Sequence, residues 1–442
     1  MSFDSKAAYE RISLLFDEGS FIETGALITG KDSSLQGDGV VTGYGTVNGR
    51  LAFCYSENPE AAGGSLGQMH ARKISAITNM AVKTGAPLIG IIDSNGVRVS
   101  EGNDSLWSFG KLFSYSAKAS GVIPRIAVIY GNCGGGMSVN AALSDFVFME
   151  NDAKLFMLSP DAVKDNFTEK CDTASAKFRY ENTALCDFAG TKEEISEKVR
   201  ELMTFLPQNN EQDLSEVECT DDLNRSTEGI SQLKDKKDML KEIADDEKFI
   251  EFKGGYSKSM VTGFIKLNGK TVGACANNCD EMCSLGAEKA ASFIRFCDAF
   301  NIPLLTLCDV KGVKNTVKNE KRISKSLAQL AEAYASLSVP AVTCVTGKAY
   351  GTCGIIMGSK AVGADICFAL SDARMGLMEK EQMDKLTEVN KDKDIYSAQY
   401  NAEEGYIDDI IDPAELRQRL CASFEMLYTK SVPLLPRKHS AL

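Results

Sequence analysis

The chain has 442 residues, 44% of them hydrophobic and 25% charged, and its formal net charge at pH 7 is −12. This acidity argues against nucleic-acid binding, which requires a basic face. No apolar run approaches the roughly 20 residues that span a bilayer, and the first residues lack the pattern of a secretory signal. With 14 cysteines and no such signal, we expect a cytoplasmic protein with reduced thiols.

The first half of the chain predicts strands alternating with helices. Asn48-Gly49 separates two apolar runs, which is typical of a β-hairpin. The elements expected after it are a helix at 65–83, a strand at 88–93, a helix at 106–119, a strand at 126–130, a glycine-rich turn at 131–137, a helix at 138–143 and a strand at 146–149. Such alternation with largely apolar strands predicts an α/β fold with a covered sheet.

The second half repeats the first. The hairpin pattern returns around Asn268-Gly269, a helix is expected at 287–299 and a strand at 342–346. Asp93 recurs as Asp309, 216 positions later. This period is far longer than a solenoid unit of about 20–50 residues and indicates a duplicated domain. We predict domains at 1–207 and 242–442, joined by a polar linker at 208–241.

A glycine-rich cluster follows a predicted strand and precedes a helix in each half, at 131–137 and at 347–354. Such a turn can present free backbone N–H groups at the positive end of a helix, where they hold an anion or a developing oxyanion. The alternative is a tight turn whose small residues only allow close packing. The recurrence of the glycine-rich turn in both halves favours the functional interpretation, in which the N–H groups hold an anion or oxyanion.

Other motifs are weaker. Neither cluster ends in the Gly-Lys-Ser/Thr of a Walker A loop. Gly63-x-Ser65-x-Gly67 fits a nucleophile elbow, but the chain contains only two histidines, at 70 and 439, and the second half lacks the elbow glycines. The hydrolase hypothesis is therefore disfavoured. Cys275, Cys279 and Cys283 do not have a usual metal-ligand spacing, so we expect free thiols and no metal site.

Ordered motifs occur in both halves of the chain. They include Gly63-Gly64-Ser65-Leu66-Gly67-Gln68-Met69-His70-Ala71, Asp93-Ser94-Asn95-Gly96-Val97-Arg98, Gly347-Lys348-Ala349-Tyr350-Gly351 and Gly405-Tyr406-Ile407-Asp408-Asp409. Through these motifs, and over nearly its whole length, the chain resembles the carboxyltransferase subunits of biotin-dependent acyl-CoA carboxylases and decarboxylases, such as propionyl-CoA carboxylase β and methylmalonyl-CoA decarboxylase α.

The resemblance implies two tandem crotonase-like ββα-superhelix domains and a homohexamer, a trimer of dimers. Each active site would lie between the N-terminal half of one protomer and the C-terminal half of its partner, with acyl-CoA on the first and biotin on the second. The amides of Gly135 and Gly136 would hold the thioester oxygen as the acyl group becomes an enolate. The amides of Thr352 and Cys353 would hold the ureido oxygen of biotin.

The resemblance also implies the remaining binding residues and the partners. No Met-Lys-Met biotinylation motif occurs, so biotin would sit on a separate carrier protein, served by a biotin carboxylase or by sodium-pumping decarboxylase subunits at a membrane. Apolar Ile355 permits a short acyl group. Arg72 and Lys73 are either CoA-phosphate ligands or solvated surface residues. The binding residues implied by the resemblance are Gly63, Gly64, Ser94, Gly96, Arg98, Gly134, Gly312, Tyr350 and Gly351.

The chain departs from the usual family pattern at several places, among them Asn95, Lys311, Thr352 and Cys353 and the more basic loop at 314–321. These departures leave an alternative open: a non-catalytic or regulatory subunit of the same fold. The leading interpretation is a carboxyltransferase that moves a carboxyl group between carrier-bound biotin and the α-carbon of a short acyl-CoA.

Overall fold

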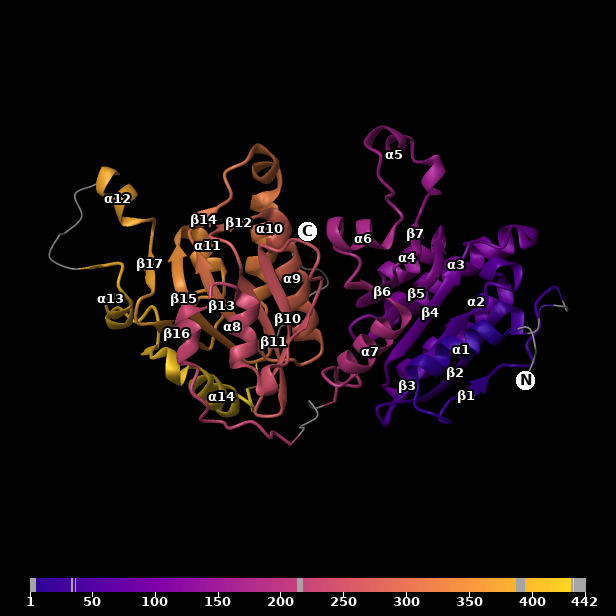
Figure 1. The fold of residues 1–442 in the computed structure, drawn as a ribbon, viewed down its shortest axis with the longest axis horizontal. Coiled ribbons are helices and arrows are strands. Elements are labelled where there is room, and N and C mark those ends of the chain that lie inside the picture. Colours follow the sequence, from indigo (N-terminus) through magenta and orange to yellow (C-terminus); the bar gives the residue numbers. More distant parts are fainter. Residues whose placement is uncertain are drawn as a thin grey trace. The chain divides into compact units, whose positions relative to one another are not determined.

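The computed structural model describes residues 5–32, 35, 37–212, 218–386, 394–430 and 432. The chain divides into two compact units, Met1–Gln212 and Asp213–Leu442 (Figure 1). In the part of the chain that is described, no helix combines the length and the apolar character needed to cross a membrane.

The first unit, over its described residues, is built on one eight-stranded sheet with the order β1-β2-β3-β4-β5-β6-β8, and β7 pairs with β5. Pairing is antiparallel from β1 to β3 and parallel from there on. The strands are β1 (Ile22–Thr24), β2 (Val40–Val47), β3 (Arg50–Glu57), β4 (Leu88–Ser94), β5 (Arg125–Gly134), β6 (Phe146–Glu150), β7 (Lys154–Phe156) and β8 (Phe188–Gly190).

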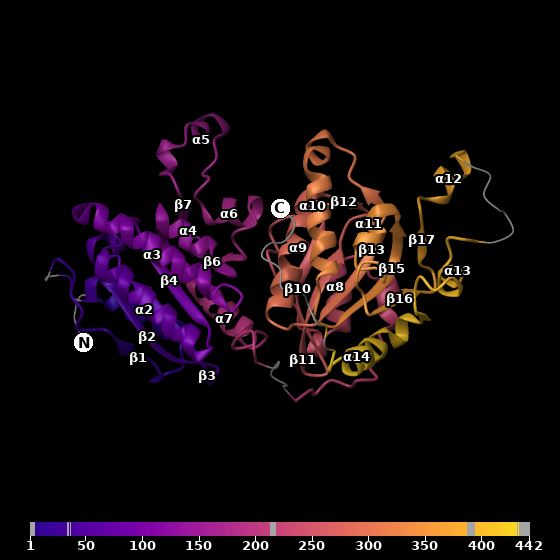
Figure 2. The same ribbon diagram turned by 180° about the vertical axis from the view of Figure 1, so that it is seen from behind.

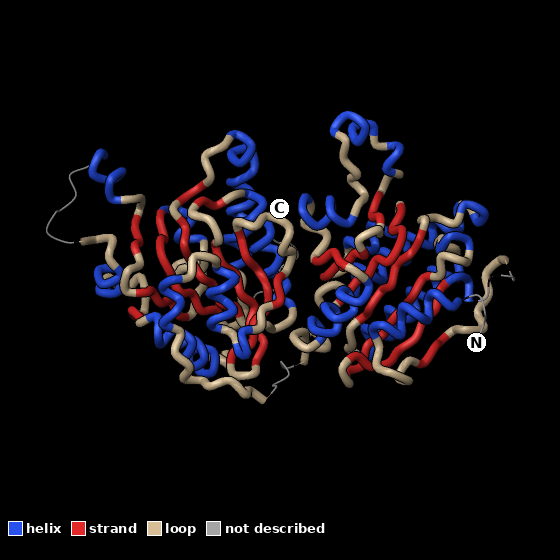
Figure 3. Tube along the Cα trace, in the orientation of Figure 1, coloured by secondary structure: helices blue, strands red, loops and turns tan. Residues whose placement is uncertain are grey.

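The second unit repeats this topology. Its main sheet, within the described ranges, has the order β18-β16-β15-β13-β11-β10-β9, with β17 on β15 and a separate pair β12-β14 (Figure 3). The strands are β9 (Ile250–Glu251), β10 (Met260–Leu267), β11 (Lys270–Asn277), β12 (Glu281–Met282), β13 (Leu304–Val310), β14 (Gly312–Val313), β15 (Ala341–Tyr350), β16 (Ile366–Leu370), β17 (Arg374–Gly376) and β18 (Asp409–Ile411).

Helices cover each sheet. α2 packs beside α3 in the first unit, and α9 packs beside α10 in the second (Figure 2). The helices are α1 (Lys6–Leu15), α2 (Gln68–Thr84), α3 (Asn103–Ala119), α4 (Gly136–Ala142), α5 (Lys164–Glu169), α6 (Ala176–Asn182), α7 (Lys192–Met203), α8 (Lys236–Ile243), α9 (Ser284–Ala299), α10 (Val317–Ala335), α11 (Gly351–Ile356), α12 (Lys380–Leu386), α13 (Ala398–Glu403) and α14 (Leu416–Met426).

The two predicted hairpins are confirmed. Asn48 and Gly49 have φ values of 52° and 75° and join β2 to β3, and Asn268 and Gly269 have the same values between β10 and β11. Two consecutive positive φ values match the right-handed twist of the flanking strands, which is why Asn-Gly is favoured there.

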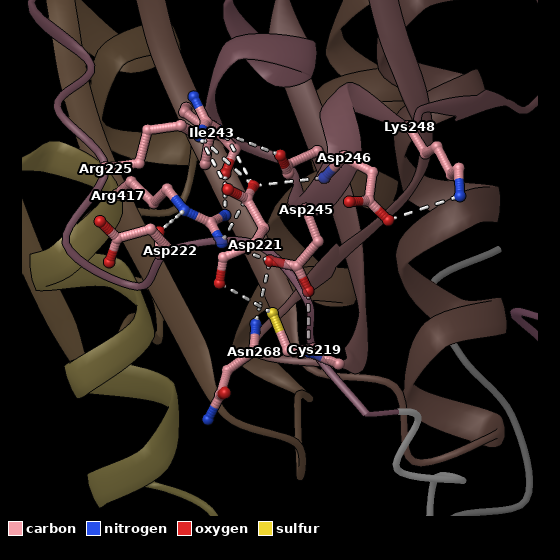
Figure 4. Close-up of polar contacts among 12 residues, drawn as sticks. Cys219, Asp221, Asp222, Arg225, Ile243, Asp245, Asp246, Lys248, Asn268 and Arg417 are labelled. Carbon is pink, nitrogen blue, oxygen red and sulfur yellow. Dashed lines mark hydrogen bonds and ion pairs between the residues drawn. The ribbon is translucent and has the colours of Figure 1, made fainter.

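The structure differs from the predicted linker at 208–241. Residues 228–244 contribute to the core of the second unit, because Met239, Leu240 and Ile243 of α8 and the preceding Ile230 are buried there. Arg417 of α14 is fully buried and bonds to Asp245, while its side chain also lies 3.4 Å from Asp221 (Figure 4). The segment from 218 onward is therefore an integral part of the second unit.

The structure also differs from the predicted glycine-rich turn at 131–137. Its first four residues continue β5, because residues 132–134 pair with residues 154–156 of β7. In the second unit the corresponding residues 348–350 pair with 374–376 of β17. The turn into the following helix is therefore confined to one glycine in each unit.

Candidate active site

An aspartate at the end of one strand fixes the end of the next strand in both units. Asp93 of β4 accepts the Asn132 N–H at 3.0 Å, and Asp309 of β13 accepts the Lys348 N–H at 2.9 Å. Gly131 and Gly347 must be glycines, because a Cβ at either position would overlap the neighbouring carboxylate. This repeated contact sets the direction in which β5 and β15 run toward the helices that follow them.

The strand-to-helix corner of the first unit is made by Gly135, whose φ of 53° suits glycine. Its N–H donates to the Phe156 carbonyl at 2.9 Å, so this predicted oxyanion donor is already used within the fold. The next two N–H groups, those of Gly136 and Met137, have no acceptor among the described residues, as expected for the first turn of α4.

The corner of the second unit has the same shape. Gly351, 216 positions after Gly135, has a φ of 58°, and α11 begins there. Thr352 and Cys353 supply first-turn N–H groups that find no acceptor in the described part of the chain, and neither has a left-handed backbone. The structural counterparts of Thr352 and Cys353 are therefore Gly136 and Met137, one position later than the predicted pair Gly135 and Gly136.

The predicted glycines of the first unit converge next to its corner. The Gly63 carbonyl accepts the Asn95 N–H at 3.1 Å, and a Cβ on Gly64 would overlap the Asp93 carbonyl. A Cβ on Gly96 would lie 3.0 Å from the carbonyl of Gly134. These positions, predicted as binding residues, lie in one region, where close backbone packing demands glycine.

Ser94 and Arg98 also lie in this region, but both are buried and occupied by the protein itself. Ser94 Oγ accepts the Gly96 N–H at 3.2 Å. The Arg98 guanidinium pairs with Asp38 and Glu101 and donates to the Ser65 carbonyl at 2.7 Å. In this structure Arg98 therefore holds the loop before α2 in place, and it is not exposed to a ligand.

The second corner adjoins a cavity of about 490 Å³. Gly351, Gly354 and Ile355 line the cavity from the corner, and Tyr406 lines it from the segment before β18. Tyr350 is 6% exposed and packs edge-on against Tyr396, with ring centroids 6.5 Å apart. Gly312 lies in β14, which contacts α11, so it is near the same corner. Thr352 is exposed, and burial raises the pKa of the Cys353 thiol to about 11.

The geometry contradicts a hydrolase at Ser65. Ser65 Oγ donates to the Ala62 carbonyl at 2.7 Å. The His70 ring is fully buried, with Nδ1 3.0 Å from the Asp38 carbonyl oxygen and Nε2 3.3 Å from Glu57 Oε1. Burial lowers the pKa of His70 well below its usual range and raises that of Glu57 well above it. His439 lies outside the described residues.

Three side chains with alternative interpretations can now be placed. Lys73 is 2% exposed and donates to the carbonyls of Gly37 and Val40, so neither CoA phosphates nor solvent reaches it. Cys283 is the N-cap residue of α9, and its sulfur accepts the Gly286 N–H at 3.3 Å. Arg72 is exposed.

Comparison with known proteins is consistent across the chain. A family model described as the carboxyl transferase domain matches residues 4–442. The propionyl-CoA carboxylase beta chain of Roseobacter denitrificans is 36% identical, with 98% of this chain and 92% of that protein aligned. The methylmalonyl-CoA decarboxylase subunit alpha of Propionigenium modestum is 35% identical, with the same coverage of each chain.

A solved structure gives the same result. The crystal structure of transcarboxylase 12S, described as a hexamer with hydrolysed methylmalonyl-coenzyme A bound, matches with a TM-score of 0.91 and 31% identity. The match covers 99% of this chain and 92% of that chain. The predicted tandem crotonase-like architecture is confirmed, and it defines the class of the protein as a carboxyltransferase enzyme. The chain belongs to the carboxyl transferase domain family.

Proposed function

We propose that this carboxyltransferase moves a carboxyl group between biotin on a carrier protein and the α-carbon of a short acyl-CoA. The observation that carries the proposal is the pair of matched corners, each offering two main-chain N–H groups at the start of a helix. The named activities of the relatives, on propionyl-CoA and methylmalonyl-CoA, support a short acyl group.

At the first corner the reacting group would be the thioester of the acyl-CoA. Loss of the α-proton places negative charge on the thioester oxygen, which must be stabilised for the reaction to proceed. The N–H groups of Gly136 and Met137 are held by the fold at the start of α4, where Gly136 is partly exposed and Met137 is buried. Each well-aimed donor of this kind contributes roughly 3–4 kcal/mol to the transition state.

At the second corner the residues fit biotin. The N–H groups of Thr352 and Cys353 suit a ureido oxygen, which is an acceptor, and the adjoining cavity offers apolar side chains such as Ile355 and Met375 to the rest of a small bicyclic ligand. When bound, biotin supplies the transferable carboxyl group, and the protein contributes orientation and dipoles. We further propose a hexamer, as described for transcarboxylase 12S, in which the two kinds of corner come from different protomers.

A carboxyl-exchange assay tests this function. The purified protein is incubated with methylmalonyl-CoA labelled in its free carboxyl group, with and without free biotin, and label loss is measured. We expect biotin-dependent release of label, undiminished in Ser65→Ala. Absence of exchange with malonyl-CoA and methylmalonyl-CoA alike would overturn the proposal and favour the non-catalytic alternative.

A further inference from the structure

One part of this acidic chain is strongly basic. Residues 311–325 contain six basic side chains and a single acidic one, Glu320. All six are exposed, in the β13–α10 connection and on the first turns of α10. We call them the α10 basic surface: Lys311, Lys314, Lys318, Lys321, Arg322 and Lys325.

Most of this charge is not neutralised by the protein. Lys311 lies 3.3 Å from Glu379, and Arg322 lies 3.1 Å from Glu288. For the remaining four lysines, the described residues provide no carboxylate within ion-pair distance. Like charges gathered on one face repel one another, so a surface of this kind gains from an anionic partner.

The α10 basic surface borders the second corner. β14 follows Lys311 directly and contacts α11, and α10 contacts α11 as well. Lys348, at the end of β15, reaches the same Glu379 that Lys311 contacts. Figure 1 shows β14, the start of α10 and α11 at one end of the sheet, and Figure 2 shows α10 and α11 at that end as well. A carrier that delivers biotin to this corner would meet these lysines.

Exposed apolar residues accompany the charge. Val317 is 76% exposed and Val313 is 37% exposed, and both lie among the lysines. Protein interfaces combine apolar contacts with complementary charge, whereas the phosphates of a nucleotide require only the charge. We infer that the α10 basic surface docks an acidic face of the biotin carrier protein, an inference that rests on the proposed function.

Three synthetic peptides, each with one biotinyl-lysine and flanked by acidic, neutral or basic residues, test the inference. At low salt we expect kcat/KM for carboxyl transfer to the acidic peptide to exceed that for the neutral one by about tenfold, through faster association. The advantage should disappear at about 1 M salt, where charges are screened over about 3 Å. The basic peptide should be the poorest acceptor.

A charge-reversal variant identifies the surface. Lys318→Glu combined with Lys321→Glu should abolish or invert the preference for the acidic peptide, without changing turnover of free biotin or the KM for methylmalonyl-CoA. The matched control is Lys241→Glu combined with Lys248→Glu, which makes the same charge change at exposed positions of α8 and the segment before β9. This control should keep the preference.

Peptide binding measured by fluorescence anisotropy provides a second readout that does not depend on turnover. If free biotin is not carboxylated, the proposed function fails, while peptide binding still decides the docking surface. Equal binding of the three peptides, or an equal loss of preference in the control, would overturn the inference. A raised KM for methylmalonyl-CoA in Lys318→Glu with Lys321→Glu would also overturn it, by assigning the surface to the nucleotide.

Discussion

Two buried lysines occupy equivalent places in the two units. Lys73 donates to the carbonyls of Gly37 and Val40, and Lys289, 216 positions later, donates to those of Tyr256 and Met260. Each ties a helix to the chain at the start of a long strand. Burial lowers the pKa of both lysines to about 8. Their charge therefore costs stability at neutral pH, and the carbonyl contacts offset part of that cost.

This pKa shift predicts a specific pH dependence. Below pH 8, Lys289 is protonated in both states, but between pH 8 and its ordinary pKa of 10.5 only the unfolded chain keeps the proton. The unfolded state then binds more protons than the folded state, so the contribution of Lys289 makes the folded state more stable as the pH rises. We expect the free energy of unfolding of the wild type, minus that of Lys289→Met, to increase across this window by at most about 3 kcal/mol.

Urea denaturation at a series of pH values measures this difference, and other titrating groups cancel between the two proteins. Below pH 7 the difference should be independent of pH. A difference that stays constant or decreases between pH 8 and pH 10 would show that the pKa of Lys289 is not lowered in the folded state.

At the scale of the element, an aspartate–arginine pair fastens each hairpin. Asp17 accepts the Gly49 N–H at 2.8 Å and pairs with Arg200, and Asp245 accepts the Gly269 N–H at 2.7 Å and pairs with Arg417. The first pair is partly exposed and the second is buried. Partial burial of Asp17 raises the pKa of its carboxyl group. Hydrogen bonds from Gly49, Thr46 and Arg200 outweigh this effect and lower the pKa to about 2.

Two arginine substitutions on α14 compare how much the buried ion pair and an exposed ion pair contribute to stability. Arg417→Ala leaves Asp245 and Asp221 without their buried partner, so we expect a loss of about 3–5 kcal/mol in the stability of the second unit. Arg419 on the same helix pairs with Asp409 at the surface, so Arg419→Ala should cost only about 0–1 kcal/mol. Denaturant unfolding measures both, and equal costs would contradict the structural role of the Arg417 cluster.

What the sequence could predict depended on how local each feature is. The Asn-Gly hairpins and the helix of 65–83, found at Gln68–Thr84, follow from residues adjacent in the chain. The continuation of β5 to Gly134 depends on pairing with β7, whose residues lie 22 positions further along the chain, and local composition carries no sign of it. The same contact uses the Gly135 N–H, which is why the predicted donor pair is displaced by one residue. The burial of Arg98 could not be predicted for the same reason, since its partner Asp38 is distant in the sequence.

At the scale of the whole molecule, the duplication was visible in the sequence but the boundary was not. The average composition of 208–241 is polar, yet one face of α8 carries Met239, Leu240 and Ile243 into the second core. Amphipathic spacing over eight residues is hidden when composition is averaged over a longer segment. The first unit, in contrast, ends close to its predicted boundary, at Gln212.

Two fragments test where the second unit begins. A fragment of residues 213–442 retains α8 and the Asp221–Arg417 pair, so we expect cooperative thermal unfolding by circular dichroism. A fragment of residues 242–442 lacks Met239 and Leu240 of α8 as well as Asp221, and keeps Ile243. It exposes the apolar surface that they cover, and burial of each such side chain contributes about 1.5–3 kcal/mol. It should unfold at a clearly lower temperature, and equal transitions would restore the predicted boundary.

The central claim is that main-chain N–H groups at the first corner stabilise the enolate oxygen. Gly136→Pro removes one of these donors at a helix position that tolerates proline, and Gly136→Ala keeps it. Both bring a Cβ to about 2.7 Å from the Phe109 ring, so packing effects are shared. In the carboxyl-exchange assay, kcat of Gly136→Pro should be about 10²–10³ lower than that of Gly136→Ala. Equal kcat values in two folded variants would contradict the claim.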